Sequence, residues 1–303
     1  MKPFLTVYGS TTVDHIMTVP SLPVEGITMR IASSETVLGG VGMNVALTAA
    51  RLGCPAALCS FVGQDFPAVY RDLMRECSLI TDEFVAVDDK ETSKAIIIDA
   101  PESKQMVLFY QGPMDSLEER GVRLLKNASE SEYVHFCTGQ PRYYISTMKM
   151  LKRRRMALDP AQESHYAWGP DTFREALPMA DALFCNKLES DALSRHLGSS
   201  VFDADLDLIV CTLGSEGSLA VYKNETMSVP AVKADKVVDV TGAGDSFRGG
   251  FYAALYRGYK VPEALVIASA TASFVVESIG PLTGTPSWDN VIGRAEPYFG
   301  EIS

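Results

Sequence analysis

The chain has 303 residues, 47% hydrophobic and 21% charged, a composition typical of folded globular proteins that excludes intrinsic disorder and collagen-like repeats. Its formal net charge of −11 argues against a surface that coats nucleic acid or an anionic membrane. An anionic ligand would therefore need a local positively charged group or a set of N–H donors at its site. No run approaches the roughly 18 apolar residues of a membrane helix and the N-terminus lacks a signal-peptide core, so we expect a cytoplasmic protein.

Short β-branched apolar runs alternate with segments of helical period, which is the pattern of βαβ units and a parallel sheet. Because parallel crossovers are right-handed, we expect helices on both faces of that sheet. The predicted strands are 5–8, 56–62, 133–137, 156–158, 182–185 and 208–212. The predicted helices are 44–51, 66–76, 117–127, 144–154, 188–197, 245–256 and 262–277.

Two segments, 17–38 and 90–109, break this rhythm because they carry few helical signals. Within the second, residues 92–99 and 105–109 have the pattern of strands joined across a turn at 101–104. We predict an antiparallel β-layer outside the main sheet. It can be a plain extension of the sheet edge or a lid over a ligand cleft, and the residues alone leave both open.

Several features of the sequence point to no site. The six cysteines form no Cys-x-x-Cys pair and several lie in apolar runs, which predicts buried free thiols. The four histidines share no metal-ligand spacing. The basic run at 152–155 is explained as a solvated helix end that favours the helix dipole, so we expect no nucleic-acid partner.

The strongest local signal is the segment 239–247, Asp-Val-Thr-Gly-Ala-Gly-Asp-Ser-Phe, a turn of small residues that leads into an apolar helix. Gly242 and Gly244 let the backbone approach a ligand closely, and the N–H groups at a helix start bind anions. Asp245 would repel a phosphate there unless a metal intervenes or the carboxylate takes a proton. The alternative is a tight turn with Asp245 as its cap.

A second glycine cluster, Gly-Gly-Val-Gly-Met-Asn at 39–44, also precedes a helix. Asn44 lies where a substrate hydroxyl can be bound, or it serves as a cap. Asp14 follows the first strand, at the carboxyl end where open α/β sheets hold ligands, although a lone Asp there is also a common turn former.

Together these motifs resemble the PfkB family, the ribokinase-like carbohydrate and nucleoside kinases. The match also includes Ala-Arg-Leu-Gly at 50–53, Gly-Gln-Asp at 63–65, Asn-Lys-Leu-Glu at 186–189 and Thr-Leu-Gly-Ser-Glu-Gly at 212–217, in the family's order over nearly the whole chain. The resemblance implies one three-layer α/β/α domain over 1–303 with a mostly parallel central sheet. A small β-sheet lid would comprise approximately 15–36 and 90–111, and a homodimer would form through it.

The resemblance further implies transfer of a phosphoryl group from ATP, with Mg²⁺, to a hydroxymethyl group. Asp245 would be the base that takes the acceptor's proton, while amides around Gly242, Ala243 and Gly244 form the anion hole. This agrees with the physical reading, since phosphoryl transfer needs positioning and charge neutralisation. Asp239 aligns with a region that in some members binds a monovalent cation such as K⁺.

The nucleotide side follows from the same resemblance. Asn186 and Glu189 match the family's Asn-x-x-Glu, which acts on magnesium and phosphates, for Glu189 through water because Mg²⁺ gives up its hydration reluctantly. As an isolated pair they are ordinary exposed helix residues. Thr212, Gly214 and Gly217 match the nucleotide-side strand and loop.

Three further segments are similar to bacterial and archaeal adenosine-kinase-like members: Phe-Tyr-Gln-Gly-Pro-Met at 109–114, Asp-Pro-Ala-Gln at 159–162 and Phe-Arg-Gly-Gly-Phe at 247–251. They imply a nucleoside acceptor phosphorylated at its 5′-hydroxyl, although Gln111 and Pro113 depart from that pattern. An aromatic at 109 would stack on the base, unless it is simple core, and the amide at 162 would hydrogen-bond the base, unless it is a turn residue. The predicted substrate-binding residues are Asp14, Gly39, Gly40, Asn44, Phe109 and Gln162.

Three other functions compete with a nucleoside kinase. A sugar or sugar-phosphate kinase would share the same phosphate chemistry. A non-catalytic ligand-binding relative would be expected to lose Asp245 or the glycines, which are present. A dinucleotide oxidoreductase would carry a glycine fingerprint after the first strand, and residues 9–13 lack one.

Overall fold

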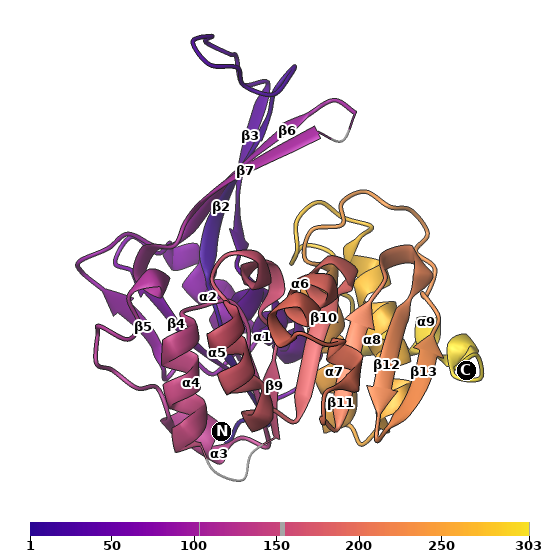
Figure 1. Ribbon diagram of the computed structural model, residues 1–303. Helices are drawn as coiled ribbons and strands as arrows, with labels where there is room; N and C mark the ends of the chain where they lie inside the picture. The colour runs from indigo at the N-terminus through magenta and orange to yellow at the C-terminus, as the bar shows by residue number, and fades with distance from the viewer. Residues whose placement is uncertain (103, 152–154, 303) are drawn as a thin grey trace.

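The computed structural model describes residues 1–102, 104–151 and 155–302. Within them nine strands form one sheet in the order β13-β12-β11-β10-β9-β8-β1-β4-β5 (Figure 1). The strands from β11 to β5 run parallel, whereas β12 and β13 add an antiparallel hairpin at one edge. The parallel strands are β1 (Leu5–Tyr8), β4 (Ala56–Gly63), β5 (Phe84–Val87), β8 (Tyr133–Phe136), β9 (Arg155–Leu158), β10 (Ala182–Asn186) and β11 (Leu208–Thr212). The hairpin strands are β12 (Ser218–Tyr222) and β13 (Glu225–Val229).

Helices cover both faces of this sheet, as the alternating pattern predicts, and each face has its own apolar core. A central strand such as β4 is buried along its whole length because both of its faces are packed. One face carries α1 (Val41–Arg51), α2 (Ala68–Glu76), α7 (Ala243–Tyr256), α8 (Val261–Val275) and α9 (Trp288–Ala295). The other carries α3 (Lys126–Glu130), α4 (Pro141–Met150), α5 (Pro170–Ala176) and α6 (Lys187–Leu197).

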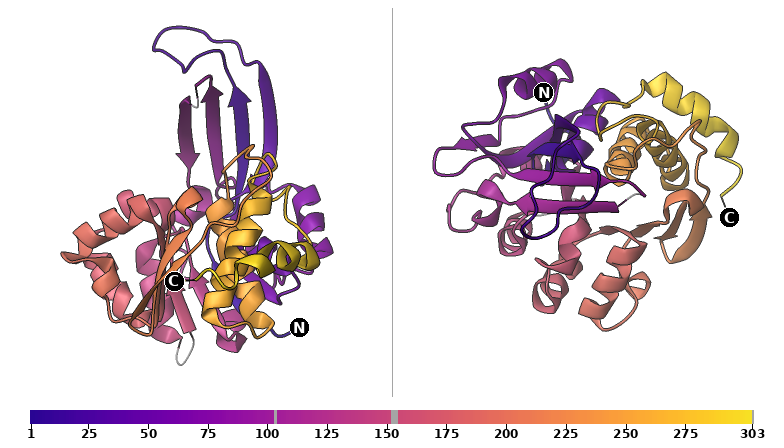
Figure 2. Two further views of the ribbon diagram at one scale, coloured as in Figure 1. Left: turned by 90° about the vertical axis from the view of Figure 1, so that its right-hand side faces the viewer. Right: turned by 90° about the horizontal axis from the view of Figure 1, so that it is seen from above.

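A second, four-stranded sheet stands above the body of the molecule (Figure 2). We call it the small sheet. Its order is β3-β2-β6-β7, and two antiparallel hairpins, β2–β3 and β6–β7, meet where β2 pairs with β6 in parallel. Its strands are β2 (Thr12–Thr18), β3 (Ser33–Gly39), β6 (Lys94–Ala100) and β7 (Lys104–Tyr110).

The prediction of a wholly antiparallel layer is therefore wrong at its centre. The strand β2 follows β1 and β6 follows β5, and both leave the carboxyl edge of the same parallel sheet. Two strands that leave one edge in the same direction can pair only in parallel. Ser103, in the predicted turn, lies outside the described residues.

The predicted helix 117–127 is also wrong, because only Lys126–Glu130 is α-helical there. Gly121 has a φ of +65°, which interrupts a helix, and Leu117 and Leu124 are buried from loop conformations instead. In place of the predicted helix 144–154, the structure has α4 at Pro141–Met150, which begins three residues earlier. Residues 152–154, with most of the basic run, are outside the described residues.

The other predicted strands and helices, and the prediction of free thiols, agree with the structure. The six predicted parallel strands and the other helices are present within a few residues of their predicted bounds. All six cysteines are free thiols and all but Cys77 are buried. In the described part of the chain, no helix is both long enough and apolar enough to span a membrane.

Candidate active site

The predicted site residues converge on the carboxyl edge of the main sheet. Asp159 follows β9, while Asn186 and Thr212 end β10 and β11 and are partners in the parallel register of those strands. Asp14, on β2, leaves the same edge after β1. Side chains far apart in sequence are thus brought together at the carboxyl ends of parallel strands, where such sheets hold ligands.

The turn Gly242–Asp245, which we call the anion turn, begins α7 close to the 281 region. Gly242 is the N-cap with a φ of +75°, and a Cβ on it would lie 2.2 Å from Cβ of Pro281, so only glycine fits. The N–H of Ala243 donates to Val240 O at 3.2 Å, so this amide is already engaged. Among the described residues, the N–H groups of Gly242, Gly244 and Asp245 have no acceptor. They are free to bind an anion.

Asp245 lies at this turn, partly buried, and is hydrogen-bonded to α1. Nδ2 of Asn44 donates to Oδ2 of Asp245 over 2.8 Å. Burial raises the pKa of Asp245 to about 6, while the positive charge of Arg248 and the Asn44 hydrogen bond oppose that shift. Oδ1 of Asn44 is buried without a partner among the described residues, so it can accept a hydrogen bond from a substrate hydroxyl.

Asp14 and the first glycine cluster also meet. A Cβ on Gly39 would lie 2.1 Å from Oδ2 of Asp14, so the close approach of β3 to this carboxylate requires glycine. Oδ1 of Asp14 accepts the N–H of Ala95 at 3.3 Å, and burial raises the pKa of Asp14. Gly40 is the N-cap of α1, the helix that carries Asn44. Asp14 and Asn44 are therefore tied to the two adjacent glycines that join β3 to α1.

Phe109 lies on the same face of the small sheet as Asp14. Ala95 on β6 pairs with Phe109 on β7. The bridge between Thr12 and Ser93 continues the register of β2 with β6, so Asp14 on β2 lies level with Ala95. Residues level across neighbouring strands point to one face, so Asp14 and Phe109 are two strand spacings, roughly 10 Å, apart. The alternative that Phe109 is simple core is wrong, because the side chain is 40% exposed.

Gln162 is exposed in a short 3-10 helix, Ala161–His165, that follows β9. No hydrogen bond of its side chain to another described residue is present. Its amide is therefore available to a ligand, and its contact with a nucleobase stays a prediction.

Asn186 and Glu189 form a capping box at the start of α6. Oδ1 of Asn186 accepts the N–H of Glu189 at 2.9 Å, and Oε2 of Glu189 accepts the N–H of Asn186 at 2.8 Å. Glu189 is 7% exposed, and burial raises its pKa. The two residues are thus not simply exposed helix residues, because together they cap the start of α6. Oε1 of Glu189 has no hydrogen-bond partner among the described residues.

The remaining predicted residues lie around the nucleotide-side loops. Oγ1 of Thr212 donates to Cys185 O at 3.4 Å, and Gly214 and Gly217 both have positive φ, in the turn between β11 and β12. The carboxylate of Asp239 accepts the N–H of Thr241 and of Gly280, each at 2.9 Å. Asp239 therefore joins the anion turn to the 280 loop, and its cation role stays a prediction.

Sequence reasoning missed two buried groups. Glu163 accepts the N–H of Gly139 at 2.7 Å and faces Gln111 Nε2 at 3.4 Å, and burial raises its pKa to about 7. Arg248 pairs with Asp159 beneath the anion turn. The sequence does carry a signal for Arg248, because it is the lone cation of α7 and is followed only by glycine and apolar or aromatic residues, so it requires a buried partner.

Comparisons with known proteins show which family and which solved structures the chain resembles. Residues 2–288 match the pfkB family carbohydrate kinases. A nucleoside kinase of Methanocaldococcus jannaschii is 31% identical over 298 residues, 97% of each chain, and its crystal structure superposes with a TM-score of 0.91 over 98% of this chain and 99% of that one. A ribokinase of Haemophilus influenzae is 26% identical, covering 95% of this chain and 96% of that one. A Burkholderia thailandensis nucleoside kinase in complex with inosine has the same fold, with a TM-score of 0.87, 22% identity and 98% of both chains covered.

Proposed function

The chain belongs to the pfkB family of carbohydrate kinases, and from that membership we propose that it transfers the γ-phosphate of ATP to the 5′-hydroxymethyl group of a nucleoside. The kinase class follows from the family, whose members phosphorylate an alcohol. The single observation that carries the reaction is the anion turn, where free N–H groups lie beside the carboxylate of Asp245. A phosphoryl group bound there would be within reach of a base.

In the proposed reaction Asp245 accepts the proton of the acceptor hydroxyl as the oxygen attacks the γ-phosphorus. Asn44 holds the Asp245 carboxylate by its amide and offers Oδ1 to the acceptor. The N–H groups of Gly242 and Gly244 stabilise the negative charge on the transferred group. The bond between the γ-phosphorus and the bridging oxygen of ATP breaks, and ADP leaves.

The donor side suits a nucleotide with magnesium. Thr212 and the 214–217 turn lie beside Asn186, at the adjacent ends of two parallel strands. The carboxylate of Glu189 is a hard oxygen group of the kind that holds hydrated Mg²⁺, which would neutralise charge on the phosphates. We propose that Glu189 acts through water. The Asp239 loop is the proposed place of a monovalent cation such as K⁺.

On the acceptor side, Asp14 and Asn44 hold ribose hydroxyls, with the backbone at Gly39 and Gly40 close by. The base then lies between Phe109 and Gln162. Because the relatives include nucleoside kinases and a ribokinase, the nucleobase contacts decide between the two acceptor classes. Stacking and one satisfied hydrogen bond each contribute about 0.5 to 1.5 kcal/mol, which corresponds to roughly a 5- to 150-fold preference for a nucleoside.

The test is a coupled kinase assay with adenosine, inosine, guanosine, cytidine, ribose, fructose and fructose phosphates, at one ATP and Mg²⁺ concentration. We expect a purine nucleoside to have the highest kcat/KM. A higher value for ribose, fructose or a sugar phosphate would replace the nucleoside assignment with the alternative, a sugar kinase with the same phosphate chemistry.

The base is tested with Asp245→Asn. Asparagine retains the shape but cannot take the proton, so kcat should fall by about 10² to 10⁴ while the nucleotide affinity changes little. Asp181→Asn is the matched control, because it makes the same replacement at a carboxylate just before β10, at the edge of the sheet opposite the anion turn. A variant at 245 that keeps more than about half of the wild-type kcat removes the base role.

A further inference from the structure

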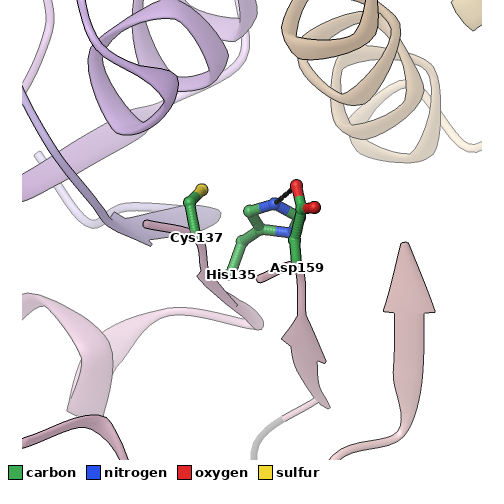
Figure 3. A group of neighbouring side chains, drawn as sticks. All are labelled: His135, Cys137 and Asp159. Carbon is green, nitrogen blue, oxygen red and sulfur yellow. Dashed lines mark hydrogen bonds and ion pairs between the residues drawn. The ribbon is translucent and has the colours of Figure 1, made fainter. Parts of the chain in front are cut away.

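Three buried side chains beneath the site form a cluster with the composition of a metal centre (Figure 3). Ligand atoms of His135, Cys137 and Asp159 lie within 4.8 Å of one another. The charges around the cluster argue against a bound metal ion. Nη2 of Arg248 donates to Oδ1 of Asp159 at 2.8 Å, and its Nε also pairs with this carboxylate. Burial raises the pKa of the Cys137 thiol and lowers that of His135, so both stay neutral. A cation there would face the guanidinium.

The cluster instead holds Arg248 in place. Nε2 of His135 lies 3.1 Å from Oδ2 of Asp159, and Nδ1 of His135 lies 2.9 Å from the hydroxyl of Tyr252, one helical turn beyond Arg248. For a neutral imidazole these partners assign the proton to Nε2, which donates to the carboxylate, and the tyrosine hydroxyl donates to Nδ1. Two side chains of α7 are thus fixed to the ends of β8 and β9.

Arg248 lies directly under the anion turn. It is three residues after Asp245 on α7, and helical side chains run back toward the N-terminus of their helix. Its Nη1 lies only 2.8 Å from where a Cβ on Gly244 would be. That nitrogen donates no hydrogen bond to another described residue. The guanidinium is therefore both anchored from below and open toward the turn.

Asp245 is surrounded by acidic groups from several elements. Arg248 on its own helix is the cation that acts on it, and this charge is the largest effect that opposes burial. Asp159, after β9, acts in the opposite sense but more weakly. Glu189, at the start of α6, and the thiol of Cys137, after β8, are also close enough to feel the charge of Asp245.

We propose that Arg248 is a positioning residue for the phosphoryl transfer: anchored by Asp159 and His135, it keeps Asp245 ionised at neutral pH and places a permanent positive charge under the anion turn. The guanidinium of Arg248 supplies the local positive charge that a chain of net charge −11 needs in order to bind a polyanion. The proposal rests on the proposed function, because it takes Asp245 as the base.

The test is the acid limb of the pH profile of kcat/KM, which reports the ionisation of the base in the free enzyme. Arg248→Gln removes the charge and should move the limb up by about one pH unit or more, since an opposite charge lowers a carboxyl pKa by about 1 to 3 units. Arg248→Lys keeps the charge and should move the limb by less than about half a unit. Asp159→Asn removes a negative charge that raises the pKa of Asp245, while its amide oxygen can still accept the hydrogen bond from Nη2 of Arg248 and keep the guanidinium in place, so the limb should move down.

The matched control is Arg123→Gln, which removes another largely buried arginine, paired with Glu118 at 2.7 Å, and should leave the limb in place. A purely structural Arg248 would lower activity equally at every pH, and an unmoved limb in folded Arg248→Gln overturns the proposal. If that variant does not fold, the Asp159→Asn profile decides, and an unmoved or raised limb overturns it. Wild-type chain inactive on every acceptor would instead contradict the proposed function.

Discussion

Asp245 carries a carboxylate that is costly to ionise in the position where the fold holds it. Its pKa is raised to about 6, above the roughly 3.9 of an unfolded chain, so the folded state binds the proton more tightly. The protonated carboxyl group of Asp245 therefore adds to the free energy of unfolding at low pH, and this contribution is lost as the pH rises through about 6.

Asp245→Asn should remove that loss. Compared with wild type, its free energy of unfolding should gain about 1 to 3 kcal/mol between about pH 4 and about pH 7.5, a range reduced for the partial exposure of the group. Urea unfolding of both proteins at the two pH values measures the difference. A constant difference between variant and wild type would show that the carboxylate is not strained.

Glu189 offers a clean substitution, because glutamine can accept the same capping hydrogen bond from Asn186. Glu189→Gln should therefore keep α6 intact while it removes a charge. We expect at least about a tenfold increase in the Mg²⁺ concentration for half-maximal activity. Glu263→Gln, which alters the equivalent cap of α8 away from the site, is the control. Unchanged Mg²⁺ titration in the 189 variant would remove Glu189 from the metal role.

Among the elements, those with local signals could be predicted and those fixed by distant partners could not. The strands β1 and β11 were predicted to the residue, because buried parallel strands are continuous apolar runs. The helix at 117–127 failed because one glycine with positive φ outweighed an apolar pattern. The parallel pairing of β2 with β6 depends on two segments about 80 residues apart, and no local pattern records it.

The site shows the same division. The anion turn and the first glycine cluster can be recognised in the sequence by their glycines, because neighbouring atoms come too close to the backbone there for a side chain to fit. By contrast, the pairing of Arg248 with Asp159 joins a helix to a strand end 89 residues earlier. A charged residue in an apolar helix predicts a partner without saying which one.

The small sheet consists of two hairpins, of which β2–β3 carries Asp14 and β6–β7 carries Phe109. We propose that the small sheet closes over the acceptor and excludes water. Amides of β2, β3, β6 and β7 should then exchange more slowly when the acceptor is bound. Hydrogen exchange with and without acceptor measures this, and the β12–β13 hairpin, also antiparallel but at the far edge, is the internal control. Equal protection in both states would make the small sheet a static extension.

At the scale of the whole molecule, the edge strand β7 exposes a row of apolar side chains, with Val107 51% and Leu108 53% exposed. Leu108 lies on the face opposite Asp14, because it pairs with Ile96 while Phe109 pairs with Ala95. An apolar edge of this kind favours association, and we propose a homodimer through the small sheet.

Leu108→Lys should convert that dimer to a monomer in light scattering coupled to size-exclusion chromatography. Val69→Lys places the same charge at a comparably exposed valine, 65% exposed on α2, and should leave the dimer intact. A monomeric wild-type chain at micromolar concentration would contradict the dimer.

The order of the strands has a consequence for how recognition is encoded. Asp14, Asn44 and Phe109 belong to the first 110 residues, whereas Asn186, Thr212 and the turn 242–245 belong to the last 120 or so. The packing of α1 against α7 and the carboxyl edge of the sheet bring these two stretches together, as the hydrogen bond between Asn44 and Asp245 shows. If the proposed function holds, changes in the β2–β3 and β6–β7 hairpins would alter the choice of acceptor while the sequence of the proposed phosphate-binding residues stays the same. Under the proposed function, the contacts to the acceptor and those to the phosphates can therefore evolve separately.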